Sequence, residues 1–149
     1  MKAASYLIGH SLVIGFSLLL IFIVVATLNS LGEDYRSFGG KNEIHQLCEI
    51  IKYSTEKIYN PSDYISPTTS TMGRITLVLP DKIAGIIYKA SFVNDSVFIT
   101  TVAKPVINTT CETNLNATLS GSTIGGETEI IWVAHPDKKD EIIMRMVNE

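Results

Sequence analysis

Residues Leu7–Gly32 read LIGHSLVIGFSLLLIFIVVATLNSLG, and this stretch contains no Asp, Glu, Lys or Arg. The charge-free run begins at Ala3, so it exceeds the roughly 20 residues that span a hydrocarbon core of about 30 Å. A core helix of a small domain needs a polar face, and LLLIFIVVA at 18–26 has none. A cleaved signal, the alternative, has a shorter apolar stretch and a better cleavage site than VVATLNS. We therefore predict a permanent transmembrane helix over residues 1–32.

Charges and sequons beside this run predict the orientation of the chain. Lys2 precedes the run and Glu33 and Asp34 follow it, so the positive-inside rule places the amino terminus in the cytoplasm and the rest outside. Three N-glycosylation patterns lie beyond the run and agree with this topology, although a Ser/Thr-rich chain also produces such triplets by chance; they begin at Asn94, Asn108 and Asn116.

The chain has two cysteines, Cys48 and Cys111. In an extracytoplasmic domain an even pair is most simply a disulfide, and a loop of about 60 residues closed in this way contributes roughly 4 kcal/mol. Two buried free thiols are the alternative.

Gly39-Gly40 is expected to interrupt the helix, so residues 33–40 are interpreted as a hinge. An amphipathic helix is predicted from Lys41 to near Tyr59, where Asn60-Pro61 would end it. Its apolar stripe recurs at spacings of three and four and contains Ile44, Leu47, Cys48, Ile51, Thr55 and Ile58. We expect this stripe to cover a sheet.

Residues 60–73 have the composition of a loop, and short β-type runs follow. Asn94-Asp95 is a candidate two-residue hairpin turn between the runs 84–93 and 96–102. The first run alternates as a half-buried strand does, with one face made of Ile86, Tyr88, Ala90 and Phe92 and the other containing Lys89 and Ser91. Further runs lie at 74–79, 106–110, 115–119, 129–134 and 141–147. The predicted fold class is α+β, in which residues 41–149 form one extracytoplasmic domain with an antiparallel β-sheet of about six strands.

The sequence offers little for catalysis. It lacks the GxSxG, HExxH and phosphate-loop motifs, and its histidines, His10, His45 and His135, have no metal-site spacing. The net charge of −3 argues against nucleic-acid binding. We therefore expect no cofactor, no metal and no enzymatic activity.

Small residues within the apolar run suggest lateral association of helices. Ser5 and Gly9, and Ser11 and Gly15, have the small-xxx-small spacing, but the two pairs point to different sides of a helix. Glycine is also common in membrane helices without such a role. Gly9, Ser11 and Gly15 are thus candidate helix-packing residues. The expected partners are membrane lipid and either further copies of this chain or other pilin-like or cell-envelope proteins.

The short basic leader in MKAASYLIGHSL, followed by a long uncharged helix and a β-rich domain, resembles archaeal type IV pilin-like proteins. The resemblance implies removal of the leader by a membrane peptidase, here between Lys2 and Ala3, and a helix that stays in the membrane or enters a filament. Family members often begin Gln-x-Ser-x-Glu after the cut. Ser5 matches the serine, whereas Ala3 and Leu7 replace the glutamine and glutamate.

Together these features predict a cell-surface structural protein, pilin-like, that serves as a filament subunit or an accessory pilin. It would lie in the cell membrane as a single-pass protein or in an extracellular filament. The alternative is a single-pass anchored binding or stator-type module that does not polymerise.

Overall fold

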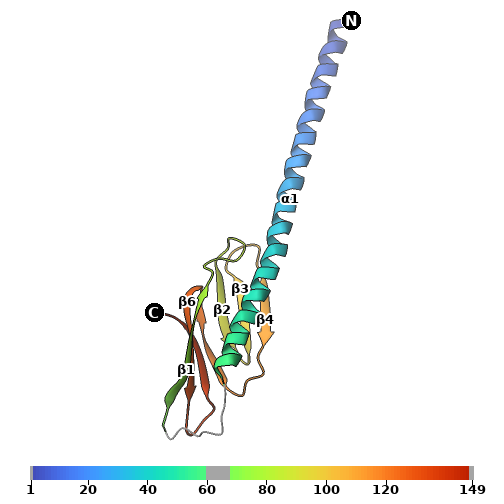
Figure 1. Ribbon diagram of the computed structural model, residues 1–149. Coiled ribbons are helices and arrows are strands. Elements are labelled where there is room, and N and C mark those ends of the chain that lie inside the picture. The colour runs from blue at the N-terminus through green and yellow to red at the C-terminus, as the bar shows by residue number, and fades with distance from the viewer. Residues whose placement is uncertain (1, 60–67, 148–149) are drawn as a thin grey trace. The chain divides into compact units, whose positions relative to one another are not determined.

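The computed structural model describes residues 2–59 and 68–147, with side-chain surroundings described from residue 10 onward. Within these ranges the chain forms one helix and seven strands (Figure 1). The elements are α1 (Lys2–Ile58), β1 (Ser70–Leu79), β2 (Tyr88–Val93), β3 (Ser96–Thr101), β4 (Asn108–Glu112), β5 (Thr118–Thr123), β6 (Gly126–Ala134) and β7 (Glu141–Met146). The fold class is therefore α+β, as predicted.

The chain divides into two compact units, the first ending at Arg36 and the second beginning at Ser37. The first unit is helical, and every residue from His10 to Arg36 is exposed. The second unit contains the remainder of α1 and the whole sheet. The boundary between the units lies inside the segment 33–40 that the sequence analysis assigned to a hinge.

The seven strands form one sheet in the order β1-β6-β7-β5-β2-β3-β4. Neighbouring strands are antiparallel except β5 and β7, which pair parallel through Thr118↔Glu141 to Gly121↔Met144. The sheet is thus mixed, and it differs in this pair from the antiparallel sheet that we expected. The reason is topological: the chain reverses after β5 and again after β6, so β7 runs in the direction of β5, and it inserts between β5 and β6.

The second half of α1 covers one face of this sheet, as predicted (Figure 1). Five residues of the predicted apolar stripe are buried, and the sixth, Ile58, packs partly buried against the core. Their sheet partners include Tyr88, Ala90 and Phe92, which alternate along β2 with the less buried Lys89 and Ser91. Strand periodicity thus identified the buried face of β2 correctly.

The predicted hairpin turn is confirmed. Val93 pairs with Ser96 across Asn94-Asp95, and Asn94 has a φ of 54°, a left-handed conformation that asparagine tolerates in such turns. The predicted loop at 60–73 is too long, because Ser70 already begins β1; its residues 60–67 lie outside the described part of the chain.

The predicted interruption at Gly39-Gly40 is wrong, because α1 continues through both glycines. Gly40 is buried, and a Cβ placed there would lie 2.5 Å from Ile107 Cδ1 and 3.3 Å from Ala84 Cβ. Glycine in a helix interior costs only about 1 kcal/mol, which helix on both sides and packing can offset. At Gly40 the missing side chain lets α1 approach the loops that carry Ala84 and Ile107.

Candidate functional site

The exposed apolar segment of α1 is the main candidate for a functional region. Within the described residues, one helix is long and apolar enough to cross a membrane, and none of its most apolar window is buried in the protein. Fourteen large apolar side chains between Leu12 and Leu31 are exposed on all sides of the helix. Leaving them in water is unfavourable by on the order of 20 kcal/mol or more relative to an apolar environment.

One polar side chain of this segment, Thr27, is satisfied within the helix. The Thr27 hydroxyl donates a 2.8 Å hydrogen bond to Ile23 O, four residues earlier in the helix. This bond satisfies the hydroxyl inside the helix, which is how threonine side chains are accommodated away from water. The helix itself satisfies the backbone groups, so the segment presents an apolar surface.

The candidate packing and processing residues lie on this helix. Ser11 and Gly15 are exposed, and a Cβ at Gly15 would have no atom within 4 Å, so this side of the helix is open to a partner. Gly9, Lys2 and Ala3 have helical backbone, and their side-chain positions lie outside the described part of the structure. Leader processing and helix association remain predictions for these residues.

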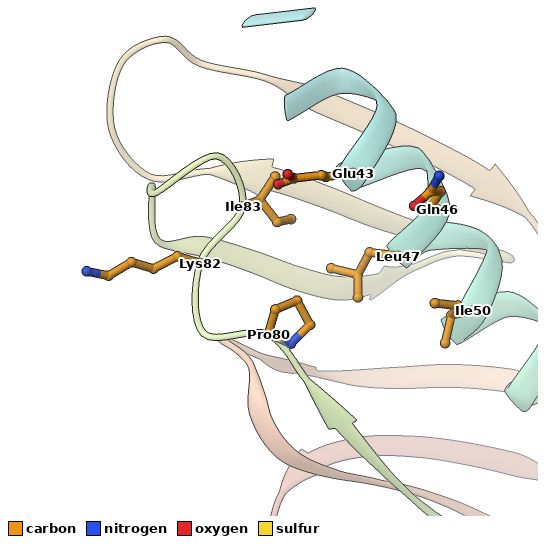
Figure 2. A pocket seen from close by; sticks show the side chains of 7 residues that line it. All are labelled: Glu43, Gln46, Leu47, Ile50, Pro80, Lys82 and Ile83. Atoms are coloured by element: carbon orange, nitrogen blue, oxygen red, sulfur yellow. The ribbon is translucent and has the colours of Figure 1, made fainter. Parts of the chain in front are cut away.

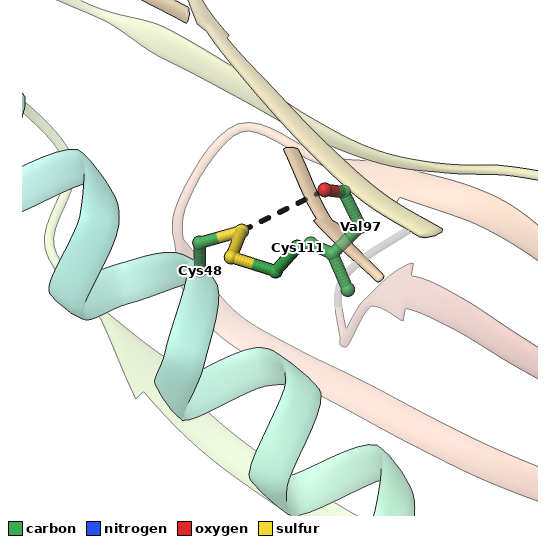
Figure 3. Close-up of a disulfide and its surroundings, with 3 residues drawn as sticks. All are labelled: Cys48, Val97 and Cys111. Atoms are coloured by element: carbon green, nitrogen blue, oxygen red, sulfur yellow. Dashed lines mark hydrogen bonds between the residues drawn. A yellow bond between two sulfur atoms is a disulfide. The ribbon is translucent and has the colours of Figure 1, made fainter. Parts of the chain in front are cut away.

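A disulfide joins Cys48 of α1 to Cys111 of β4 (Figure 3). The two Cα atoms are 6.0 Å apart, within the usual range, and both residues are buried. Cys48 Sγ also lies 3.6 Å from Val97 O; since a bonded sulfur carries no proton, this is a packing contact rather than a donated hydrogen bond. The bond that the sequence predicted therefore fastens the helix to the edge strand of the sheet.

The disulfide also brings together a potential metal-ligand group. Ligand atoms of His45, Glu49 and Cys111 lie within 4.8 Å of one another. The Cys111 sulfur is already bonded to Cys48 and is not a thiolate, and thiolate is the form that binds metals. His45 and Glu49 alone are two exposed side chains on adjacent helical turns, so this group is not a metal centre while the disulfide is intact. No spacing in the sequence predicts this grouping, because Cys111 is brought to His45 and Glu49 only by the disulfide.

The three sequon asparagines are accessible. Asn94 lies in the β2–β3 turn, Asn108 at the start of β4 and Asn116 between β4 and β5, and all three are exposed. Exposure is a requirement for modification and does not establish it, so glycosylation stays a prediction.

A pocket of about 320 Å³ lies between α1 and the loop that follows β1 (Figure 2). Its lining residues are Glu43, Gln46, Leu47, Ile50, Pro80, Lys82 and Ile83. One Glu43 carboxylate oxygen accepts a 2.7 Å hydrogen bond from Ala84 N. This bond links α1 to the loop that follows β1. The volume is at the lower end of the range for small-molecule sites. Lys82 points away from Glu43 (Figure 2), so the acid and the base of the lining do not converge on one point.

Charged side chains on the sheet form structural networks. Glu129 of β6 is nearly buried and accepts from Arg74 of β1 at 3.4 Å and from Arg145 of β7 at 3.2 Å. Its neighbours Thr128 and Ile130 are fully buried, and Ile130 belongs to the core that α1 covers. Because successive side chains of a strand point to opposite faces, Glu129 and its two arginines lie on the face away from α1. Pairing a carboxylate with two guanidinium groups is a stabilising arrangement for a poorly solvated acid.

A second network lies where α1 ends. Tyr59 stacks edge-on against Trp132 with ring centroids 5.3 Å apart, and its hydroxyl donates to Asn116 O at 3.1 Å. Trp132 Nε1 donates to Asp140 Oδ2 at 3.0 Å, and burial together with the Asp140 charge raises the pKa of Tyr59. These contacts fasten the end of the helix to the sheet.

Comparison with protein-family models, with curated proteins and with solved structures finds no match for this chain. Its function is therefore argued from the segment, the disulfide and the sheet domain described above.

Proposed function

We propose that this chain is a membrane-anchored structural protein of the cell surface, in which the first 32 residues anchor the sheet domain outside the cytoplasm. The exposed apolar surface of α1 between Leu12 and Leu31 carries this proposal. A soluble monomer rarely exposes a continuous apolar surface of that size, because such surfaces mark interfaces with lipid or protein.

The disulfide and the exposed sequons support an extracytoplasmic location for the sheet domain. Disulfides persist in oxidising compartments, and a bond between Cys48 and Cys111 suits a domain exposed there. The residues gathered around the pocket and the sheet networks have structural partners, so we propose a non-catalytic role. The domain would then act through protein contacts.

Within this class we propose a pilin-like protein, on the basis of the short basic leader and the continuous helix that leads into a sheet domain. The leader would be cleaved between Lys2 and Ala3, and the mature helix would either remain in the bilayer or join a filament. Because Ala3 and Leu7 replace the usual glutamine and glutamate, we propose an accessory subunit on equal terms with a major one. An archaeal source and glycosylation belong to the same proposal.

Mass spectrometry of the native amino terminus tests the pilin-like assignment. Protein purified from cell envelopes, and separately from sheared surface filaments, would be analysed. We expect a chain that begins at Ala3 in either fraction. An intact Met1 in the membrane fraction alone would instead support the plain signal-anchored binding or stator-type module. Recovery from a salt wash in soluble form would contradict both.

Self-association is tested by oxidative cross-linking, in native membranes, of variants that have one added cysteine while Cys48 and Cys111 stay in their disulfide. Ser11 and Gly15 share one side of α1, and Val13 lies on the opposite side, since successive residues are about 100° apart. We expect Ser11→Cys to form covalent dimers and the matched Val13→Cys to form few. Equal or absent cross-linking at the two positions would contradict assembly through the Ser11–Gly15 side. Because Val13 follows Gly9 by four residues and shares its side of the helix, stronger cross-linking at Val13 would indicate assembly through the Ser5–Gly9 side instead.

A further inference from the structure

The sheet domain has two dissimilar ends, which are defined by the course of α1 beside it. At one end, here called the Gly40 end, Gly40 packs against Ile107 and Ala84, and the loops 80–87 and 102–107 meet (Figure 1). At the other, the Tyr59 end, the turns around Asn116 and Asp140 contact Tyr59 and Trp132. The chain enters the domain at the Gly40 end.

Exposed apolar side chains gather at the Gly40 end. Ile87, Val102 and Val106 are 52%, 68% and 64% exposed. Val102 N donates to Ile87 O at 2.8 Å, which places the two loops side by side. By contrast, none of the large exposed apolar residues falls in the described turns 94–95, 113–117 and 135–140 of the Tyr59 end. These turns carry Asn, Asp and Lys.

The patch of Ile87, Val102 and Val106 has a defined conformation. Thr101 Oγ1 donates to Pro105 O at 2.9 Å and accepts from Ile107 N at 2.8 Å, so one side chain closes the loop that presents both valines. A loop fixed in this way offers its apolar side chains without further ordering, which favours contact with another surface.

The charges near the patch also differ from those of an ordinary solvent-exposed loop. The loops 80–87 and 102–107 contain Lys82, Lys104 and a single acid, Asp81, and Glu43 of α1 accepts a hydrogen bond from Ala84 N in the first loop. Lys104 lies between the two exposed valines in the sequence and is itself exposed. Apolar side chains flanked by lysine are the composition of surfaces that enter the headgroup region, where the ammonium group meets lipid phosphate.

The length of chain between the patch and the apolar segment favours lipid as the occupant. The charge-free run ends at Gly32, and Gly40 already contacts the loops, so Gly40 follows the end of the run by eight residue positions. Eight residues span about 12 Å as a helix and about 28 Å fully extended. If residues 3–32 lie in a bilayer, the Gly40 end is held close to its surface.

We propose that the patch of Ile87, Val102 and Val106, together with Lys104, docks on the surface of the bilayer that holds the anchor, with anionic lipid headgroups as the ligand. This docking rests on the proposed membrane anchor. It gives the sheet domain a second contact with the membrane, and it leaves the Tyr59 end, with Asn94 and Asn116, directed away from lipid. Asn108 lies at the Gly40 end, two residues after Val106, so the docking implies that this third sequon carries no glycan.

Lipid-quenching of a site-specific fluorophore tests this docking in the full chain. Ala103 and Lys138 are exposed residues at the Gly40 and Tyr59 ends. Ala103→Cys and the matched Lys138→Cys would each carry a thiol-reactive dye, with the buried disulfide left oxidised. Each protein would be reconstituted in phosphatidylcholine–phosphatidylglycerol vesicles, with and without a spin-labelled lipid. We expect the dye at 103 to lose most of its emission and the dye at 138 to keep it.

A second variant separates docking from simple proximity to the membrane. Val102→Asp and Val106→Asp, added to Ala103→Cys, should restore most of the emission, while co-flotation with vesicles stays unchanged. Three results would overturn the docking: equal quenching at 103 and 138, quenching at 103 that persists in the aspartate variant, or a blue-shifted emission at 103 that the spin-labelled lipid does not quench. The third result would indicate that the patch contacts protein instead of lipid. Loss of co-flotation in the unsubstituted chain would instead refute the anchor itself.

Discussion

Gly39 and Gly40 are neighbours in α1, yet an added methyl group would meet different surroundings at the two positions. At Gly39 it would have no atom within 4 Å, whereas at Gly40 it would press on buried Ile107 and on Ala84. The pair looked like a hinge because both residues lower helix propensity equally. Only the tertiary contact of Gly40 distinguishes them, and sequence periodicity contains no information about that contact.

This difference gives a matched pair of substitutions. Gly39→Ala should stabilise the sheet domain by about 0.5–1 kcal/mol, because alanine is the better helix former. Gly40→Ala gains the same propensity but must displace Ile107, and overpacking a filled site costs about 1–3 kcal/mol. Urea unfolding of the purified chain in detergent would measure both. If Gly40→Ala proved as stabilising as Gly39→Ala, the close packing at Gly40 would be refuted.

Tyr88 is a second residue whose surroundings predict a measurable effect. It is fully buried at the start of β2, and its hydroxyl has no hydrogen-bond partner among the described residues. Burial, with a smaller effect of the Asp81 charge, raises the pKa of Tyr88 to about 12 from an ordinary value of 10.0.

The sign of the pH dependence follows from this rise. The folded state holds the Tyr88 proton more tightly than the unfolded state, so its contribution to stability is complete below pH 10 and is lost as the pH rises toward 12. Tyr88→Phe should lack this alkaline loss, which amounts to about 2–3 kcal/mol. Urea unfolding from pH 8 upward would measure it, with the exposed Tyr53→Phe as control. Parallel alkaline losses in wild type and Tyr88→Phe would contradict the assignment.

At the scale of elements, the disulfide is the covalent link between α1 and β4. The link closes a sequence separation of 63 residues, so its loss should lower the free energy of unfolding by about 4 kcal/mol. Urea unfolding with and without reductant measures this, and Cys48→Ala/Cys111→Ala should unfold at the same urea concentration under both conditions. Two free thiols in the denatured, unreduced wild type would contradict the bond.

The elements also show how far sequence patterns extend in this chain. The stripe from Ile44 to Ile58, the alternation in β2 and the turn at Asn94-Asp95 depend on local spacing, and the sequence predicted all three. The parallel pairing of β5 and β7 depends on which strands meet after the chain reverses twice, so no local pattern reports it.

The bridge of Arg74, Glu129 and Arg145 could not be predicted from local sequence patterns for the same reason. Its three residues come from β1, β6 and β7, and they become neighbours only through sheet order. The patch of Ile87, Val102 and Val106 is a similar case. The sequence predicted Val102 and Val106 as strand residues, whereas both lie in the loop between β3 and β4, and Val102 bonds to Ile87 of another loop. Composition located the apolar segment at once, since that signal is contiguous in sequence.

At the scale of the whole molecule, the chain combines a unit with an apolar exterior and a unit with an apolar interior. The first unit exposes its large side chains from Leu12 to Leu31, while the second encloses a core between α1 and the sheet. A bilayer or a bundle of like helices would remove the apolar surface of the first unit from water, whereas most of the surface of the second unit is suited to water. The proposed surface role depends on this contrast.

Flotation of the purified full chain with lipid vesicles in a density gradient, beside a chain that begins at Glu33, measures this contrast directly. If residues 3–32 insert into lipid as proposed, the full chain should rise with the vesicles and resist an alkaline wash, and the shorter chain should remain in the aqueous fraction. A full chain that stays in the aqueous fraction as a monomer, without detergent, would contradict the membrane anchor on which the proposed function rests.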